Sequence, residues 1–187
     1  MLVLVVIALV VGYAVLSGRW VGHEPGWYAA LPRPSWQPPP WVFGVAWPLN
    51  FLALAVAGSA VVTSAPTGAA LGFVGVLAAS IALALGWAYA FYVPHRLDLA
   101  AILLGGAAAL TWVLVLVAGR QLTWAGWLLV PYAAWLTVAT SLSVGYWART
   151  GAAVLAREPP ERARQSLGAS PSAPVPRRHG CSALPRL

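Results

Sequence analysis

The stretch from Trp41 to Pro94 carries no Asp, Glu, Lys, Arg or His, and this feature restricts the fold more than any other. A helix needs about 20 apolar residues to cross the hydrocarbon core of a bilayer, so the stretch is long enough for two crossings. A second uncharged stretch, from Gln121 to Ala148, is long enough for another. In hydrocarbon the backbone must satisfy its own hydrogen bonds, as a helix does. The sequence therefore predicts an all-α membrane protein.

Charged residues, proline and glycine divide the apolar sequence into five helices, with breaks near residues 64–68, 95–98 and 119–121. The predicted spans are residues 2–17, 41–63, 68–92, 97–118 and 122–147. The first span has no basic residues before it and no small-x-small cleavage site before Arg19, so we expect a membrane helix and not a cleaved signal peptide. A chain that is 60% hydrophobic and 8% charged also suits a bilayer as its main surroundings.

The C-terminal part of the chain differs in composition from the rest. In residues 149–187, Pro, Ser, Ala and Arg replace Leu, Val and Trp, so this part cannot bury enough apolar surface to fold alone. We expect a transmembrane domain over residues 1–148 and a disordered cytoplasmic tail over 149–187. The only cysteine, Cys181, lies in this tail, which excludes an internal disulfide.

The distribution of arginine predicts the orientation of the bundle. With five spans, the loop over residues 19–40, the turn at His95 and the tail share one side, and Arg120 is the only arginine on the other. Basic residues favour the cytoplasmic side, so we expect the N-terminus outside and the C-terminus inside. The net charge of +7 then reflects topology and attraction to anionic headgroups, and no nucleic-acid partner is expected.

Titratable residues are scarce and scattered, which limits the chemistry the chain could perform. All the acidic residues fall in predicted loops or the tail: Glu24, Asp98, Glu158 and Glu161. A bundle with no ionisable residue argues against an ion-coupled carrier. The histidines, His23, His95 and His179, lie in separate segments with no second ligand nearby, so no metal site is expected. Surface histidines are the simpler reading, and axial ligation of a haem by His23 or His95 is the alternative.

The chain has eleven tryptophans, and nine of them form two groups by position. One group lies at predicted helix ends, where an interfacial belt explains it: Trp20, Trp27, Trp41, Trp124 and Trp147. The other lies deeper: Trp47, Trp87, Trp112 and Trp135. An indole N–H at depth needs an acceptor, so these rings either pack between helices or line a cavity. Asn50, one turn beyond Trp47, is a rare polar side chain that could serve a ring or a ligand. Together with Pro48 and Pro131, which free backbone carbonyls, these residues indicate a mostly apolar pocket between helices.

Three prolines stand between Trp36 and Trp41, at the mouth of the uncharged run. Proline restricts its own backbone and that of the preceding residue, so this segment is predicted to be a rigid, aromatic lid and not a helix. A different pattern, Gly68-x-x-x-Gly72 followed by Gly75-x-x-x-Ala79, gives the third helix a flat face. That face suits either a homodimer or close packing within the chain.

Two blocks of this sequence resemble the signature of the TspO/MBR family, the tryptophan-rich sensory proteins related to the mitochondrial translocator protein. The first block is Trp36-x-Pro38-Pro39-x-Trp41-Val42-Phe43, preceded by Trp27-Tyr28 and followed by Trp47. The second is Trp124-Ala-Gly-x-Leu-Leu-Val-Pro131-Tyr132-x-x-Trp135-x-x-x-Ala139-Thr140-x-Leu142. The resemblance covers about residues 1–148.

The resemblance implies a five-helix bundle whose lid loop, between the first two spans, closes over a pocket for protoporphyrin or haem and, in some members, sterol-like ligands. It also implies that Tyr28 and Trp36 belong to the lid and that Arg33 could pair with a porphyrin propionate, since guanidinium binds a carboxylate bidentately. The residue pattern and the resemblance together give the predicted ligand site: Tyr28, Arg33, Trp36, Pro39, Trp47, Asn50, Ala84, Trp87, Trp135 and Ser143.

Some positions depart from the family pattern. Ala84 and Ser143 stand where the family has Asn, Ser80 where it has Gln, and Ala108 where many members have Trp. Each change removes a polar or aromatic contact from the expected pocket. Near the end of the last span, Val144, Tyr146 and Arg149 fit a cholesterol-recognition pattern, for which anchoring of a helix end at the interface is the alternative.

The leading hypothesis is a membrane protein that binds tetrapyrroles in a sensory, regulatory or transport role and requires no resident cofactor. One alternative, also implied by the resemblance, is light- and oxygen-dependent porphyrin degradation with Trp47 and Trp135 as catalytic candidates. Passive transport of porphyrins is another. Alanine-rich spans and arginine as the only basic side chain suggest a high-GC bacterium, and therefore its plasma membrane.

Overall fold

The computed structural model of this chain describes residues 1–21 and 23–157. Its elements are α1 (Leu2–Val21), α2 (Pro25–Ala30), α3 (Pro40–Ser64), α4 (Thr67–Tyr92), α5 (Leu97–Gln121) and α6 (Thr123–Arg157). Residues Met1–Gly151 form one compact unit. Within the described residues, five helices are long and apolar enough to cross a bilayer, namely all except α2. The prediction of an all-α bundle with five spans is confirmed.

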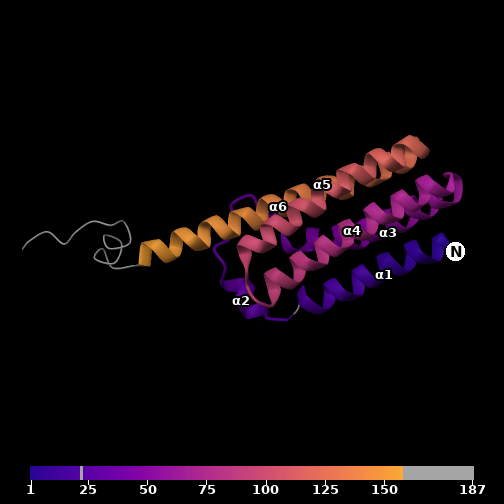
Figure 1. The fold of residues 1–187 in the computed structure, drawn as a ribbon. Coiled ribbons are helices and arrows are strands. Elements are labelled where there is room, and N and C mark those ends of the chain that lie inside the picture. The colour runs from indigo at the N-terminus through magenta and orange to yellow at the C-terminus, as the bar shows by residue number, and fades with distance from the viewer. Residues whose placement is uncertain (22, 158–187) are drawn as a thin grey trace, which may run out of the picture. The chain divides into compact units, whose positions relative to one another are not determined.

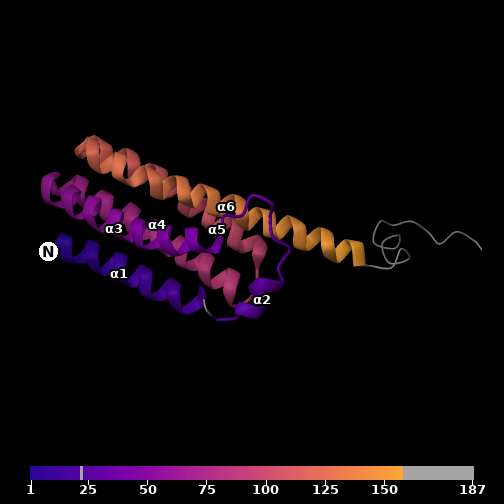
Figure 2. The same cartoon turned by 180° about the vertical axis from the view of Figure 1, so that it is seen from behind.

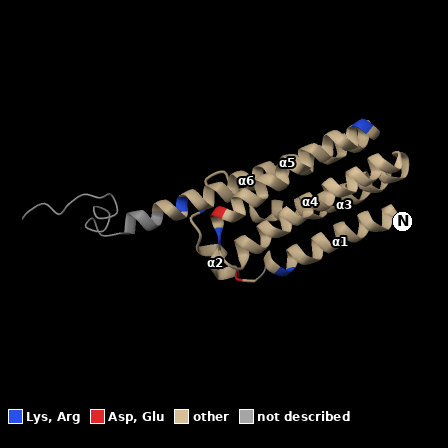
Figure 3. Ribbon diagram, in the orientation of Figure 1, with Lys and Arg blue, Asp and Glu red and all other residues tan. Residues whose placement is uncertain are grey.

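The five long helices lie side by side (Figures 1 and 2). The N-terminus and the α3–α4 and α5–α6 turns lie at one end of the bundle, and α2 and the α4–α5 turn lie at the other, which we call the α2 end. The charged positions of the described residues gather at the α2 end, apart from Arg120 at the end of α5 (Figure 3). This separation is the one predicted from the arginine distribution.

Proline sets several of the helix starts. Pro40 is the first residue of α3 and Pro25 the first of α2, while Pro66 immediately precedes α4. A proline is tolerated at a helix start because the missing N–H would have had no partner there. The segment before Pro40 is not helical, as predicted, but α2 was not expected within the loop.

The last helix continues further than the sequence suggested. We predicted its end at residue 147, whereas α6 runs to Arg157 and so includes the first part of the predicted tail. Residues 148–156 include four alanines, the residue that most favours helix, and contain no proline. The tail beyond residue 157, with Glu158, Glu161, His179 and Cys181, lies outside the described residues.

The core is built from close helix contacts and a few buried hydroxyls. A Cβ on Gly58 of α3 would lie 2.8 Å from Val6 of α1, so only glycine allows this crossing. Ser80 of α4 and Thr111 of α5 are both buried, and their hydroxyl oxygens lie 2.9 Å apart. The Thr111 hydroxyl donates to the carbonyl oxygen of Ala107. Ser80 thus serves helix packing. By contrast, a Cβ added to the glycines of the predicted flat face on α4 would meet nothing within 4 Å, so that face packs against no other part of the described bundle: Gly68, Gly72 and Gly75.

Candidate functional site

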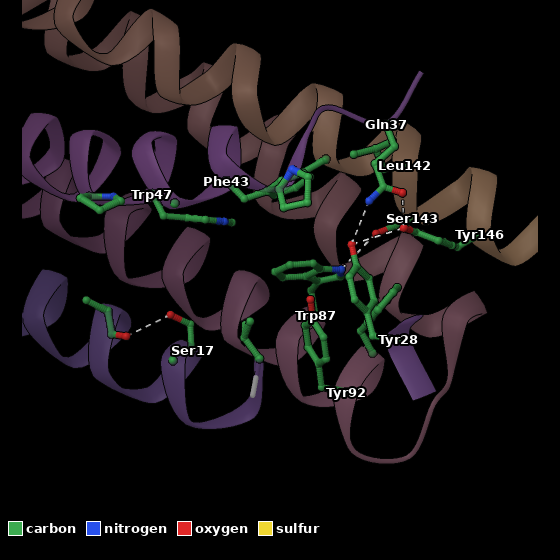
Figure 4. Close-up of a pocket in the computed structure, with 18 of the residues that line it drawn as sticks. Ser17, Tyr28, Gln37, Phe43, Trp47, Trp87, Tyr92, Leu142, Ser143 and Tyr146 are labelled. Atoms are coloured by element: carbon green, nitrogen blue, oxygen red, sulfur yellow. Dashed lines mark hydrogen bonds between the residues drawn. The ribbon is translucent and has the colours of Figure 1, made fainter. Parts of the chain in front are cut away.

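A cavity of about 440 Å³ opens at the α2 end, between α1, the lid, α3, α4 and α6 (Figure 4). This volume falls in the range of about 300–1,000 Å³ typical of small-molecule pockets. Aromatic rings form much of its wall: Tyr28, Phe43, Trp47, Phe51, Trp87, Phe91, Tyr92 and Tyr146. Four polar side chains join them: Ser17, Arg33, Gln37 and Ser143. The cavity is therefore apolar, with few polar contacts, as the sequence predicted.

Trp47 and Trp87 form the flat part of the wall. Their rings, from α3 and α4, are 6.4 Å apart between centroids and only 21° from parallel. Phe51 continues the row, 5.8 Å from Trp47 at 28°. Offset, nearly parallel rings expose a broad π-surface, which suits contact with a flat aromatic molecule.

The indole of Trp87 has its acceptor within the bundle. Its Nε1–H donates to the hydroxyl of Ser143 on α6 at 3.0 Å. Ser143 is 2% exposed, so this bond satisfies both groups away from water. The serine that stands at the family's asparagine position therefore still supplies a polar partner, and it orients the tryptophan ring at the cavity wall.

A hydrogen-bonded ring of three side chains joins the lid to α6. The Tyr146 hydroxyl donates to Oε1 of Gln37, and Nε2 of Gln37 donates to the Tyr28 hydroxyl at 3.3 Å. The two tyrosine hydroxyls are themselves 3.3 Å apart (Figure 4). Tyr146, predicted as part of a sterol motif or as an interfacial anchor, instead lines the cavity and holds the lid.

Trp36 fastens the lid from outside the cavity, contrary to its predicted place in the ligand site. Its ring is half exposed, and its Nε1–H donates to the Ser141 hydroxyl at 3.3 Å. The guanidinium of Arg149 lies 5.6 Å from the ring centroid. Beneath it, a Cβ on Gly145 would lie 3.0 Å from Trp36 and 2.9 Å from Pro34. The lid thus rests directly on the backbone of α6.

At the other edge of the lid, α2 is held by Trp27, which stacks on His95 with centroids 3.9 Å apart. Glu24 lies between two histidines, with carboxylate oxygens 3.8 Å from His23 Nδ1 and 3.6 Å from His95 Nε2. His95 occupies the left-handed region, with φ 57°, at the tight α4–α5 turn. Neither histidine lines the cavity, so this geometry gives no support to axial haem ligation. Trp27 therefore holds α2 against the α4–α5 turn, a role beyond the interfacial anchoring predicted for it.

Other predicted site residues also lie outside the cavity wall. Trp135 packs edge-on against Phe43, with ring centroids 5.2 Å apart. The phenyl ring of Phe43 lines the cavity, where the indole of Trp135 was predicted to lie. Asn50 is 5% exposed and Ala84 fully buried, both inside the bundle. Among the described residues, neither the Asn50 amide nitrogen nor the Trp135 Nε1 has a hydrogen-bond partner. Pro39 precedes α3 and is exposed, as is Val144 on α6.

The predicted residues that the cavity does bring together are Tyr28, Arg33, Trp47, Trp87 and Ser143. Sequence reasoning missed Gln37, Phe43, Phe51, Phe91 and Tyr92. A helical spacing signal existed for three of these, since Phe43, Trp47 and Phe51 recur every fourth residue along α3, and Phe91 follows Trp87 by four.

Comparison with known proteins gives a consistent result. A family model described as "TspO/MBR family" matches residues 2–148. The chain is 36% identical over 121 residues to a tryptophan-rich sensory protein of Cereibacter sphaeroides, covering 63% of this chain and 72% of that one. It is 34% identical over 132 residues to Protein CrtK of Rhodobacter capsulatus, covering 66% and 79%. It is 35% identical over 140 residues to the human translocator protein, covering 71% and 80%.

Proposed function

Because this chain belongs to the TspO/MBR family, we propose that its cavity binds a tetrapyrrole, protoporphyrin IX or haem, in a sensory, regulatory or transport role. The chain is an integral membrane protein, with relatives named tryptophan-rich sensory protein and translocator protein. The observation that carries the proposal is an aromatic cavity of about 440 Å³ beneath a lid that contributes one arginine. No resident cofactor is part of the proposal.

The aromatic wall supplies the apolar contact. A tetrapyrrole is a flat aromatic molecule, and the Trp47 and Trp87 faces offer offset stacking over its ring system. Tyr28 and Tyr92 add hydroxyl-bearing rings at the lid side of the same space. A bulky sterol-like ligand would use the same cavity, because Val144 of the sterol pattern faces outward while Tyr146 faces inward.

Arg33 supplies the polar contact at the mouth of the cavity. Within the described residues the carboxylates are Glu24 and Asp98, and their ion-pair partners are His23, His95 and Arg96. Arg33 therefore keeps its guanidinium available for a ligand carboxylate, such as a porphyrin propionate.

Titration of the purified protein with protoporphyrin IX, followed by porphyrin absorbance and tryptophan quenching, tests the proposal. We expect saturable binding that Trp47→Ala weakens and that Trp112→Phe, outside the cavity, leaves unchanged. Arg33→Gln should weaken binding of the free acid by about tenfold and leave the dimethyl ester unaffected, since only the free acid offers a charged partner. Absence of saturable binding tighter than about 1 mM would refute tetrapyrrole binding.

Photo-oxidation of a bound porphyrin is the second candidate, and one observation favours it. Trp47 lines the cavity and also contacts the buried ring of Tyr13 edge-on, at 6.2 Å between centroids. Illumination in air should bleach bound porphyrin faster than free porphyrin, and Trp47→Phe should slow the bleaching more than Trp135→Phe, because Phe43 separates Trp135 from the cavity. Identical bleaching with and without protein would eliminate this candidate.

We also propose an orientation in the membrane and a homodimer interface. Arg19, Arg33, Arg96 and Arg149 belong to the α2 end, which we assign to the cytoplasm of a bacterium, with the N-terminus outside (Figure 3). The contact with Asp98 raises the pKa of Arg96, so its positive charge persists at any cellular pH. The uncovered glycine face of α4 is the proposed homodimer interface.

A further inference from the structure

A second hollow lies on the outside of the bundle, at the end opposite the lid. It is a groove of about 610 Å³ between the last turns of α5 and the first turns of α6. Its lining is Trp112, Val115, Leu116, Gly119, Arg120, Thr123, Gly126, Trp127 and Val130. Leu116 and Trp127 of its lining are 62% and 71% exposed, and both helices are long and apolar enough to span the membrane, so this groove faces lipid.

Two glycines create the groove. A Cβ on Gly126 would lie 2.7 Å from the Cα of Gly119 and 3.0 Å from the carbonyl oxygen of Val115, so the backbones of α5 and α6 touch here. Neither glycine has a side chain that would fill the space above that contact. Trp112 and Trp127, which are 41% and 71% exposed, stand beside it as walls. The result is a furrow with a backbone floor and aromatic sides.

The groove ends at a positive charge without a counter-charge. Arg120 is exposed in the last turn of α5, and the described carboxylates, Glu24 and Asp98, lie at the α2 end. Thr123 begins α6 directly after it. The first N–H groups of a long helix and its dipole favour an anion at that position. Arginine, a threonine hydroxyl and a helix start therefore converge where the groove meets the membrane surface.

We propose that this groove binds one anionic phospholipid. The phosphate contacts Arg120 and the first turn of α6, and an acyl chain lies along Leu116 and Val130 between the two tryptophans. From Arg120 to Trp112 the wall extends about 12 Å along α5, which matches the upper part of an acyl chain below its headgroup. A zwitterionic lipid gains less, because no described carboxylate is present at this end to receive its ammonium group.

Native mass spectrometry of the delipidated full chain tests this site with phosphatidylglycerol and phosphatidylcholine of identical acyl chains. We expect the first phosphatidylglycerol to bind at least about fivefold more tightly, the ratio that one arginine near a headgroup supplies. Arg120→Gln should lower this ratio about fivefold, whereas Arg120→Lys should retain most of it. Arg19→Gln, an exposed arginine at the α2 end, is the matched control and should retain the full ratio.

A groove-filling change separates this site from general attraction to charge. Leu116→Trp keeps Arg120 but occupies the furrow, and it should abolish the first tight phosphatidylglycerol site. Equal affinity for the two lipids in the unmodified chain, or a preference that Arg120→Gln does not diminish, would overturn the proposal. Protein dimers that disappear in Leu116→Trp while the lipid preference persists would also overturn it, because a second copy would then occupy the groove.

Discussion

Replacing Gly145 by alanine should loosen the lid without weakening the helix bundle. The lid segment rests on α6 at this residue, where an added Cβ would lie 2.9 Å from the Cγ of Pro34 and 3.0 Å from the Cζ2 of Trp36. Non-bonded carbon atoms in proteins do not approach so closely, so either the α6 backbone or the lid must move. The helix backbone is held by its own hydrogen bonds and by burial, whereas the lid can lift.

The free-energy cost of the added Cβ follows from the type of steric clash that it makes. Overpacking by one carbon in a well-packed contact costs about 1–3 kcal/mol, which would raise the equilibrium constant for lid opening by about 5- to 150-fold. The same substitution removes a glycine from a helix interior and should stabilise α6 itself by up to about 1 kcal/mol. The lid and the bundle should therefore respond in opposite directions.

Hydrogen exchange measures the two responses separately. We expect faster exchange at Leu31 and Gln37, whose N–H groups bond within the lid to Tyr28 and Pro34, and an unchanged or higher melting temperature of the protein. Gly151→Ala, on the same helix with no atom within 4 Å of the new Cβ, is the matched control and should leave lid exchange unchanged. Equal lid exchange in both variants would refute the reasoning.

Two further predictions concern the bundle, and both are read from thermal unfolding in detergent. Ser143→Ala leaves the partly buried N–H of Trp87 without its acceptor and should cost about 1–3 kcal/mol, while Ser141→Ala removes the acceptor of the exposed Trp36 indole and should cost much less, because water can replace that bond; equal losses would mean that burial adds nothing to the Trp87 bond. Gly126→Ala brings a Cβ within 3 Å of the α5 backbone and should lower the melting temperature strongly, whereas Gly68→Ala, with open space around it, should not; tolerance of both changes would contradict the described α5–α6 contact.

The fold was largely predictable because the bilayer restricts it. Uncharged runs fix the number of spans, and prolines and charges fix most helix ends. Two features escaped this reasoning. The short helix α2 depends on a tertiary contact, the stacking of Trp27 on His95, which no local pattern indicates. The extension of α6 to Arg157 shows that leaving the bilayer does not end a helix when the following residues favour one.

The candidate site was only half predictable, and rotation of the helices explains why. In a soluble helix, polar residues mark the outer face, but here both the lipid face and the inner face are apolar. Depth in the membrane singled out Trp47 and Trp87, which line the cavity, together with Trp112 and Trp135, which do not, because depth does not give the direction in which a side chain points. Trp135 therefore seemed equivalent to Trp47 until the structure placed Phe43 in front of it.

The lid is attached at two edges that belong to different helices. On one edge Trp36 is bound to α6, and on the other Trp27 is bound to the α4–α5 turn, with Tyr28, Arg33 and Gln37 facing the cavity between them. Between these edges the hydrogen bonds of Tyr28, Gln37 and Tyr146 tie the same segment to α6, so opening the cavity requires release of this central attachment as well as of an edge. Because the two edge attachments share no residue, substitution of Trp36 or of Trp27 would weaken one edge of the lid and leave the contact at the other edge in place.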